Sequence, residues 1–385
     1  YLTIQAALNA ADANDTVFVN AGTYAENLVW PNTTGIMLAG IAGASSLNVM
    51  IDGGGLGAVI TIDQAVSASI INLTIQNGSN GNPDTGGGGI HVGNAVTFFG
   101  LTDAYVSGNT TTGAGGGVYI ANTAGNWIEN STFISNTADM GGAVAASSNL
   151  NIISTLFDFN LAGSNGGAVY VSNPSALNTN SPVTLSYVTA SGNQSALNGG
   201  MVYTVVPLTI QNSNFFANQV TGDGNGGAVW VSGNFTVSNT SFNANVVTSN
   251  AGTGYGGAIF FRSTAPEVIG SITDTSFADN NAGNETGVQV AGGAVYMKLN
   301  AAINDAPYVV TFNRVLFEAN RISANVGSGP DMARGGAVAV DVSWVYFSNV
   351  TFNANVAHNT NGTDGQAVGG ALWVGGAAYV DACRF

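Results

Sequence analysis

The sequence has very few basic residues. Only six of its 385 residues are Lys or Arg, and none of them occurs before Arg262. Because 21 residues are Asp or Glu, the formal net charge is −15. A surface of that charge repels the phosphates of nucleic acids and of anionic lipids. We therefore expect neither a nucleic acid nor a membrane surface as a partner.

Cysteine and long apolar segments are scarce as well. The lone cysteine, Cys383, excludes a disulfide framework within the chain and fits a small buried residue better than a thiol that pairs outside it. No run of about 18 apolar residues is present, so no transmembrane helix is expected. No signal peptide is visible. Because the chain starts at Tyr1 without Met and stops at Phe385 within a repeat, we interpret it as a segment of a longer protein.

What the sequence has instead is a repeat rich in glycine, which accounts for 54 residues. Ten times a Gly-Gly pair precedes a small residue and a short β-branched or aromatic run, as in G-G-A-V-Y-V at Gly166 and G-G-A-V-W-V at Gly226. A second motif, F-x-x-N, occurs seven times. Recurrence at a spacing of roughly 25–40 residues indicates a solenoid. The alternation of apolar and polar residues between the motifs has period two, which indicates strands.

These patterns predict an all-β fold, a single-stranded right-handed parallel β-helix of roughly a dozen coils, in which strands of successive coils pair about 4.8 Å apart. Gly-Gly suits a corner that needs positive φ or close backbone approach. The motif phenylalanines should stack in the interior, and Tyr187 is expected to replace Phe in the repeat that lacks it. Stacked asparagines can form an amide ladder at a bend. The predicted ladder consists of Asn136, Asn160, Asn218, Asn245, Asn280, Asn320 and Asn355.

The first 85 residues lack the Gly-Gly signature but fit the same architecture. Residues 4–11 predict a short helix that caps the first coil, and residues 15–20 predict a first strand. We therefore expect one continuous solenoid over residues 1–385, with a cap and degenerate coils over 1–85 and repeat coils over 86–385. Because no cap is visible at Phe385, we expect the far end to continue, to be capped by further sequence or to pair with a partner.

A line of aromatic side chains is the first candidate surface. Within each Gly-Gly strand the residue between the β-branched ones should point to the opposite face. If it points outward, the aromatics form either a surface that binds a partner or sugar rings, or a cross-strand stack that steadies the sheet. The residues concerned are Tyr119, Tyr170, Tyr203, Trp230, Phe260, Tyr296 and Trp373.

Twelve N-x-S/T sequons form a second set of candidates. They become glycan sites only if the protein is made where such machinery exists and if they lie on exposed turns. The asparagines are Asn14, Asn32, Asn72, Asn77, Asn109, Asn130, Asn193, Asn234, Asn239, Asn284, Asn349 and Asn361.

The sequence contains no clear catalytic or metal site. A lyase needs a base and often a calcium ion, and a glycosidase needs two carboxylates that flank the scissile bond. Here the acids are dispersed, and Asp274 and Asp279 are the notable pair in one coil. His91 and His358 are each isolated. We therefore predict no catalytic residue, no cofactor and no metal ligand. A few acids could still hold a structural calcium ion, although no D-x-D-x-D-G loop is present.

The paired G-G-A-[ILV] and F-x-x-N motifs resemble those of the chlamydial polymorphic outer-membrane protein family over about residues 86–385. That resemblance implies a surface-exposed β-helical passenger implicated in adhesion. Residues 4–24 are similar to the opening of the broader pectin-lyase-like β-helix superfamily, which includes lyases and glycosidases.

Together these observations favour a non-catalytic extracellular or cell-surface protein with a structural and adhesive role, including that of a fibre or filament segment. Its expected partners are further copies joined end to end, neighbouring surface proteins, glycans or cell-surface receptors. A polysaccharide lyase or glycosidase, and a glycan-binding module without catalysis, are the alternatives.

Overall fold

The computed structural model describes residues 1–41, 45–82, 86–122, 125–147, 149–172, 182–249, 252–263, 269–284, 289–299, 309–324, 332–341, 344–359 and 366–385. Within these ranges, only the backbone is described for Ser263, Asn284, Leu299, Met332 and Gln366. Contacts divide the chain into two compact units. Unit 1 comprises Tyr1–Gly163, Gly167–Ala176 and Ser181–Val188, and unit 2 comprises Ser164–Gly166, Leu177–Asn180 and Thr189–Phe385. The single continuous domain over residues 1–385 stays a prediction.

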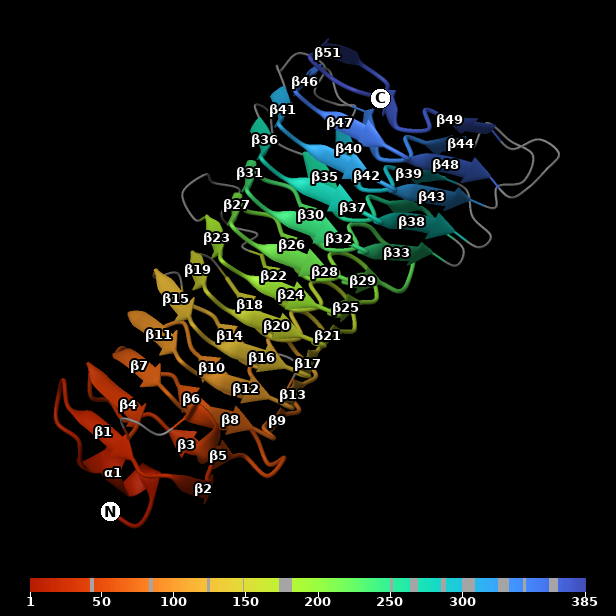
Figure 1. The fold of residues 1–385 in the computed structure, drawn as a ribbon. Helices are drawn as coiled ribbons and strands as arrows, with labels where there is room; N and C mark the ends of the chain where they lie inside the picture. The colour runs from red at the N-terminus through yellow and green to blue at the C-terminus, as the bar shows by residue number, and fades with distance from the viewer. Residues whose placement is uncertain are drawn as a thin grey trace. The chain divides into compact units, whose positions relative to one another are not determined.

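Unit 1 consists of stacked parallel strands, which Figure 1 shows in red to yellow-green. Sheet A contains β1 (Thr16–Val19), β4 (Ile36–Gly40), β7 (Ser67–Ile71), β11 (Phe98–Thr102), β15 (Asn126–Glu129), β19 (Leu150–Ile153) and β23 (Val183–Ser186). Sheet B contains β2 (Gly22–Ala25), β5 (Val49–Asp52), β8 (Thr74–Gln76), β12 (Tyr105–Ser107), β16 (Thr132–Ile134) and β20 (Leu156–Asp158). A short 3-10 helix, η1 (Ser46–Asn48), precedes β5.

Two further sheets complete the coils of unit 1. Sheet C contains β3 (Leu28–Val29), β6 (Ile60–Ile62), β10 (Ile90–Val92), β14 (Val118–Ile120), β18 (Val144–Ala146) and β22 (Val169–Val171). Sheet D contains the short strands β9 (Ser79–Asn80), β13 (Thr110–Thr111), β17 (Thr137–Ala138) and β21 (Leu161–Ala162). Each repeat coil therefore passes in order through A, B, D and C.

Unit 2 repeats this arrangement. Its sheet A contains β27 (Leu208–Gln211), β31 (Phe235–Ser238), β36 (Ile269–Thr273), β41 (Val309–Asn313), β46 (Trp344–Ser348) and β51 (Ala377–Asp381). Its sheet B contains β24 (Thr189–Ser191), β28 (Asn214–Phe216), β32 (Ser241–Asn243), β37 (Ser276–Ala278), β42 (Leu316–Glu318) and β47 (Thr351–Asn353). Its sheet C contains β26 (Val202–Thr204), β30 (Val229–Val231), β35 (Ile259–Ser263), β40 (Val295–Leu299), β45 (Val338–Asp341) and β50 (Leu372–Val374).

Unit 2 also has an additional sheet. Its sheet D contains β25 (Gln194–Ser195), β29 (Gln219–Val220), β33 (Val246–Ser249), β38 (Asn281–Asn284), β43 (Arg321–Ala324) and β48 (Val356–Asn359). Sheet E contains β34 (Gly254–Tyr255), β39 (Val290–Ala291), β44 (Met332–Arg334) and β49 (Gln366–Val368), and it lies beside sheet D (Figure 1). The strands of sheet E lie between F-x-x-N and the next Gly-Gly, so the longer connections of this unit form that sheet.

The fold is thus a right-handed parallel β-helix with a short N-terminal helix, which confirms the predicted fold class. The helix α1 (Ile4–Ala10) begins where the Thr3 hydroxyl accepts a hydrogen bond from the Ala6 amide, and it buries Ile4 and Leu8. The Gln5 side chain bonds both backbone groups of Val29, at 2.9 and 2.8 Å, which satisfies the edge of β3.

Stacked side chains fill the interior of the coils. In unit 2 the rings of Phe215, Phe242, Phe277, Phe317 and Phe352 stack successively with centroids 4.9–5.1 Å apart. The prediction for Tyr187 was wrong. Ala190 pairs with Phe215 and occupies the phenylalanine position of its coil, whereas Tyr187 sits at a corner with φ of 56° and is 62% exposed.

The two glycines of each Gly-Gly pair have different roles. Gly226 has a φ of 70°, in the left-handed region that glycine adopts without steric cost. Gly227 lies so close to the next coil that a Cβ there would be 2.0 Å from the carbonyl oxygen of Gly257. The first glycine is therefore required by the turn and the second by the packing between coils.

The motif asparagines form buried amide ladders within each unit. In unit 1 Asn136 donates from Nδ2 to the Oδ1 of Asn160, at 3.0 Å, and to the carbonyl of Val106, at 2.9 Å. In unit 2 the same pattern links Asn218, Asn245, Asn280, Asn320 and Asn355. Each amide thus satisfies backbone groups of an adjacent coil that the bend would otherwise leave unpaired.

Candidate binding surface

The aromatic residues of the Gly-Gly strands lie on the outer face of sheet C. In unit 1 the flanking β-branched residues are buried, whereas Tyr119 and Tyr170 are only partly buried. The Tyr119 ring lies 5.6 Å from that of His91. It also covers the preceding corner, because a Cβ on Gly86 would lie 2.8 Å from its ring. These side chains protect a glycine corner and still offer part of one edge to solvent.

In unit 2 the same line of residues becomes a small second core. Tyr203 stacks on Trp230 at 4.3 Å, and both are partly buried. Phe260 and Tyr296 are 3% and 5% exposed, and they cluster with Tyr255 and Ala291 of sheet E. The binding hypothesis is therefore wrong for Phe260 and Tyr296, because the added sheet covers them.

Contacts around this cluster reinforce its structural character. The guanidinium of Arg334 lies 4.6 Å from the ring centroid of Trp373, in a cation–π contact. The Tyr255 hydroxyl donates to Gln289, at 3.0 Å. Burial, with a smaller contribution from Tyr255, raises the pKa of the Tyr296 phenol. Tyr296 therefore remains a neutral packing residue.

The exposed aromatic surface lies instead on sheet A of unit 2. Trp344, Tyr346 and Tyr379 are 50%, 39% and 59% exposed. We call these three residues the aromatic face. Tyr346 pairs in register with Tyr379 of the next coil, and their ring centroids are 6.0 Å apart. Trp344 projects on the same side of β46, because the strand alternates exposed residues with buried Val345 and Phe347.

The aromatic face was not predicted from the sequence, because the predicted aromatic line comprised only residues of the Gly-Gly strands. The signal was the segment W-V-Y-F-S over residues 344–348, in which large residues occupy both faces of one strand. A strand with only its interior face in the core seldom needs aromatics on the other face. Their exposure therefore marks a candidate interface.

In unit 2 the four strands that precede β51 in sheet A carry no charge on their outer face. The outward-facing residues of the strands β31, β36, β41 and β46 include no Asp, Glu, Lys or Arg. Ile269 and Val309 precede Trp344 in one column, while Ser271 and Thr311 precede Tyr346 in the next. The nearest ionic group is the exposed Asp381, two residues beyond Tyr379 on β51 and on the same side of the sheet. Asp274 lies at the corner, where Arg314 binds it through two contacts of 2.6 Å.

A smaller aromatic site lies on sheet A of unit 1. The ring of Trp127 contacts that of Phe98, with centroids 4.4 Å apart and planes inclined at 60°. Gly100 pairs with Trp127 in register, and a Cβ there would lie 2.9 Å from the indole Nε1. The indole thus rests on a glycine and keeps 43% of its surface exposed.

The sequons fall into distinct environments. Asn109 and Asn193 are fully buried and belong to the asparagine ladders, through Asn136 and Asn218. A glycan on either would break those bonds, so the structure contradicts the prediction for these two. The exposed sequon asparagines are Asn14, Asn32, Asn77, Asn130, Asn239 and Asn349, and the partly buried ones are Asn72 and Asn234.

Four sequon asparagines lie at the equivalent corner of their own coils. Asn72, Asn130, Asn239 and Asn349 each follow a strand of sheet A and have positive φ. The Nδ2 of Asn239 donates to Asn212, at 2.6 Å, and that of Asn130 donates to Asp103. The side chain of Asn284 and the whole of Asn361 lie outside the described residues.

Two of the dispersed acids, Asp223 and Asp274, have local structural partners. Asp223 accepts from the Ser249 hydroxyl, at 2.7 Å, and from the Gly252 amide. The hydrogen bonds from Arg314 hold the pKa of Asp274 below its usual value. His91 bridges Asp63, at 3.1 Å, and the carbonyl of Gly86, at 2.8 Å. Among the described residues, no three His, Cys, Asp or Glu side chains gather as a metal site.

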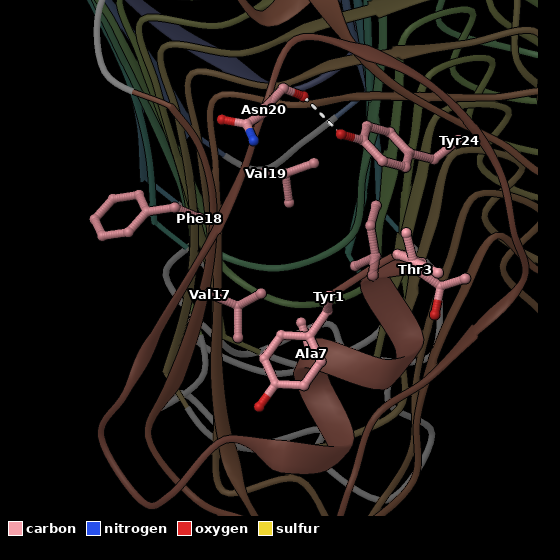
Figure 2. A pocket seen from close by; sticks show the side chains of 10 residues that line it. Tyr1, Thr3, Ala7, Val17, Phe18, Val19, Asn20 and Tyr24 are labelled. Atoms are coloured by element: carbon pink, nitrogen blue, oxygen red, sulfur yellow. Dashed lines mark hydrogen bonds between the residues drawn. The ribbon is translucent and has the colours of Figure 1, made fainter.

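A shallow hollow lies beside α1 at the first coil (Figure 2). Ala7 on the helix and Val17 and Val19 on β1 line it. The Tyr24 hydroxyl donates to the carbonyl of Asn20, at 3.1 Å, and the Phe18 ring points away from the other side chains shown (Figure 2). Its lining includes no carboxylate, histidine or cationic side chain, so it offers no acid–base pair for catalysis.

Two remaining features concern single elements. No helix in the described part of the chain combines the length and hydrophobicity needed to cross a bilayer. Cys383 is partly exposed and carries a free thiol, whose Sγ lies 3.3 Å from the carbonyl oxygen of Asp381.

Comparisons with known proteins add no relative to this description. No protein-family model matches the chain, and no curated protein matches it.

Proposed function

We propose that the chain is a non-catalytic extracellular or cell-surface protein with a structural and adhesive role. The observation that carries this proposal is the aromatic face, three exposed rings on sheet A of unit 2. A folded protein rarely leaves large aromatic side chains grouped in water unless a partner covers them. β46, which carries two of the three rings, is paired on both sides, so these rings are held on an ordered strand before a partner binds.

The interior of each unit supports the structural part of the proposal. Stacked phenylalanines and asparagines repeat from coil to coil, so each coil is stabilised by its neighbours. Adhesion uses such a scaffold because it presents side chains at fixed spacing. The exposed sequons Asn130, Asn239 and Asn349 fit a chain that meets the extracellular space.

The arrangement of the acids supports the non-catalytic part. Asp223 and Asp274 each accept hydrogen bonds from neighbouring groups. A general acid or base needs a carboxyl group that is free to face a substrate. Neither residue lies on the aromatic face. Asp381 is the one carboxylate among the outward-facing residues of β31, β36, β41, β46 and β51, so the two carboxylates that a glycosidase needs are not assembled there.

The test combines binding with product analysis. The purified protein is passed over quartz-crystal sensors coated with polysaccharides, extracellular proteins or lipid, and the eluates are assayed for new reducing ends and unsaturated sugars. We expect adsorption to at least one coating, reduced in Trp344→Ala, with no products released. Product formation would instead establish the polysaccharide-active enzyme. Adsorption to no coating would refute the adhesive role.

Localisation is tested separately on the source cells. A membrane-impermeant biotin reagent should label the protein on intact cells or in the culture fluid. Labelling only after lysis would contradict the extracellular assignment. The same preparations, viewed by electron microscopy, show whether the protein occurs in filaments, which tests end-to-end self-association.

A further inference from the structure

We propose that the partner of the aromatic face is an uncharged polysaccharide. This inference rests on the proposed adhesive function and names the chemistry of its ligand. It is carried by three properties of the surface, namely the arrangement of its rings, the backbone pairing of β46 and the lack of cationic side chains.

The rings are arranged as a platform and not as a pocket. Trp344 and Tyr346 are two residues apart on β46, and Tyr379 is one coil beyond Tyr346. Neighbouring positions are thus roughly 5–7 Å apart in both directions of the sheet. Sugar rings in a chain present successive faces of C–H groups, and aromatic rings offer flat apolar surfaces that such groups can contact. A platform of this kind suits an extended polymer better than a compact ligand.

The backbone pairing argues against an extended peptide as the ligand. β46 is hydrogen-bonded to β41 on one side and to β51 on the other. A peptide that binds by adding a strand needs an unpaired sheet edge, where main-chain groups supply affinity. β46, which carries Trp344 and Tyr346, has no such edge, whereas β51, which carries Tyr379, is paired with β46 alone. A ligand over Trp344 and Tyr346 is therefore recognised through ring contacts and side-chain hydrogen bonds.

The lack of cationic side chains selects a neutral polymer over an acidic one, and the exposed Asp381 carboxylate on β51 adds to this selection. No cationic side chain projects from the outer face of β31, β36, β41 or β46, although the chain has a net charge of −15. Uronate or sulfate groups would therefore find no counter-ion and would be repelled by the protein as a whole. Polar side chains on this side of the sheet include the hydroxyls of Ser348, Thr311 and Ser271 and the amide of Asn313, which suit sugar hydroxyls.

Affinity electrophoresis tests the proposal directly. The whole chain is run in native gels that contain hydroxyethyl cellulose, xyloglucan, galactomannan, dextran or laminarin, and in gels that contain polygalacturonate or alginate. We expect retardation by at least one uncharged polymer and by neither acidic one. Trp344→Ala and Tyr346→Ala should each weaken retardation about tenfold, and Trp344→Phe should restore most of it.

Trp127→Ala is the matched control, because it removes an exposed indole from sheet A of unit 1 and leaves the aromatic face intact. It should bind like the unaltered protein. Circular dichroism and thermal unfolding verify that each variant is folded. Equal losses in Trp127→Ala and Trp344→Ala would overturn the assignment to the aromatic face. Retardation by the acidic polymers alone would overturn the assignment to an uncharged ligand.

The outcome also separates this inference from the proposed function. If Trp344→Ala abolishes adsorption to a protein or lipid coating while no polysaccharide retards the chain, the adhesive function stands and the ligand assignment fails. If the chain adsorbs to no coating and no polysaccharide retards it, both fail. A retarded chain that releases sugars would keep the ligand assignment and replace adhesion with catalysis.

Discussion

The two units use one repeat to make different outer surfaces. In unit 1 the short connections between F-x-x-N and Gly-Gly leave Tyr119 and Tyr170 partly in contact with solvent. In unit 2 the longer connections add sheet E, and the equivalent Phe260 and Tyr296 are buried. The motif therefore determines which residues form the interior. The length of the connection determines whether the residue on the outer face is surface or core.

The two units also differ in their content of basic residues. All six basic residues lie at or beyond Arg262, in the part of the chain that carries sheet E. Arg334 covers Trp373, and Lys298 lies 5.8 Å from the ring of Tyr255. Cations thus accompany the additional aromatic core, where they contact ring faces. Unit 1 has aromatics on sheet C but no cation to place over them.

The largest effect is expected in the phenylalanine stack. Phe277→Ala removes a fully buried ring that stacks on Phe242 and on Phe317, and it should lower the free energy of unfolding of unit 2 by about 3–5 kcal/mol. Phe133→Ala in unit 1 removes a ring that stacks on Phe157 and pairs in register with Val106. Because Phe133→Ala loses one ring stack and Phe277→Ala loses two, the destabilisation caused by Phe133→Ala should be smaller by about 0.5–1.5 kcal/mol. Urea unfolding of both variants measures the difference, and equal costs would contradict it.

The asparagine ladder should behave alike in both units. Asn245→Ala leaves the amide of Asn218 and the carbonyl of Phe215 without a buried partner, which costs about 1–3 kcal/mol for each group. Asn136→Ala does the same to Asn109 and Val106 in unit 1. Hydrogen exchange around each site should increase equally. Asn239→Ala, at an exposed corner, is the control, and it should cost less than either ladder substitution because it leaves no buried polar group without a partner.

Removal of a ring from the second core of unit 2 should lower stability more than removal of the equivalent ring from unit 1. Tyr296→Ala opens the cluster beneath sheet E, and we expect a loss of about 1–3 kcal/mol. Exchange should accelerate first in β39 and β44. Tyr119→Ala, the equivalent change in unit 1, lacks a covering sheet and should cost less. A larger loss for Tyr119→Ala would show that coverage does not set the difference.

The smallest effect concerns a corner of unit 1. Hydrogen bonds from Gln76, the Gly54 amide and Asn77 lower the pKa of Asp52. Because the folded-state pKa is below the unfolded value of about 3.9, Asp52 stabilises the fold above that pH, and the contribution is lost as the pH falls through the folded value. Asp52→Asn should therefore reduce the acid sensitivity of unit 1 by less than about 1 kcal/mol. Thermal unfolding between pH 2 and 6 provides the measurement, and an unchanged pH profile would contradict it.

The sequence predicted the interior of the fold better than its surface. Stacked positions such as Phe242 and Asn245 repeat with their motif, so their burial follows from period and composition. Asn109 and Asn193 were not predicted as ladder residues. Val106 and Ala190 occupy the phenylalanine position in their coils, so neither asparagine belongs to an F-x-x-N motif. Only the alignment of neighbouring coils identifies them as ladder residues and not as glycan sites.

Surface features depend on distant sequence and were harder to predict. Phe260 and Tyr296 have the same local pattern as Tyr119, but sheet E, built from other parts of each coil, covers them. Trp344 and Tyr379 belong to different coils, and they lie near each other because β46 and β51 pair in register. The longer connections between motifs were visible in the sequence. That these connections form a sheet over the Gly-Gly strands was not.

Tyrosine nitration of the native protein, mapped by peptide mass spectrometry, tests most directly the claim that the exposed aromatic surface is on sheet A and not under sheet E. Tyr346 and Tyr379, 39% and 59% exposed, should be modified readily, as should the corner residue Tyr187. Tyr255 and Tyr296, 6% and 5% exposed, should be modified only after unfolding. Rapid nitration of Tyr296 together with protection of Tyr346 would contradict the account.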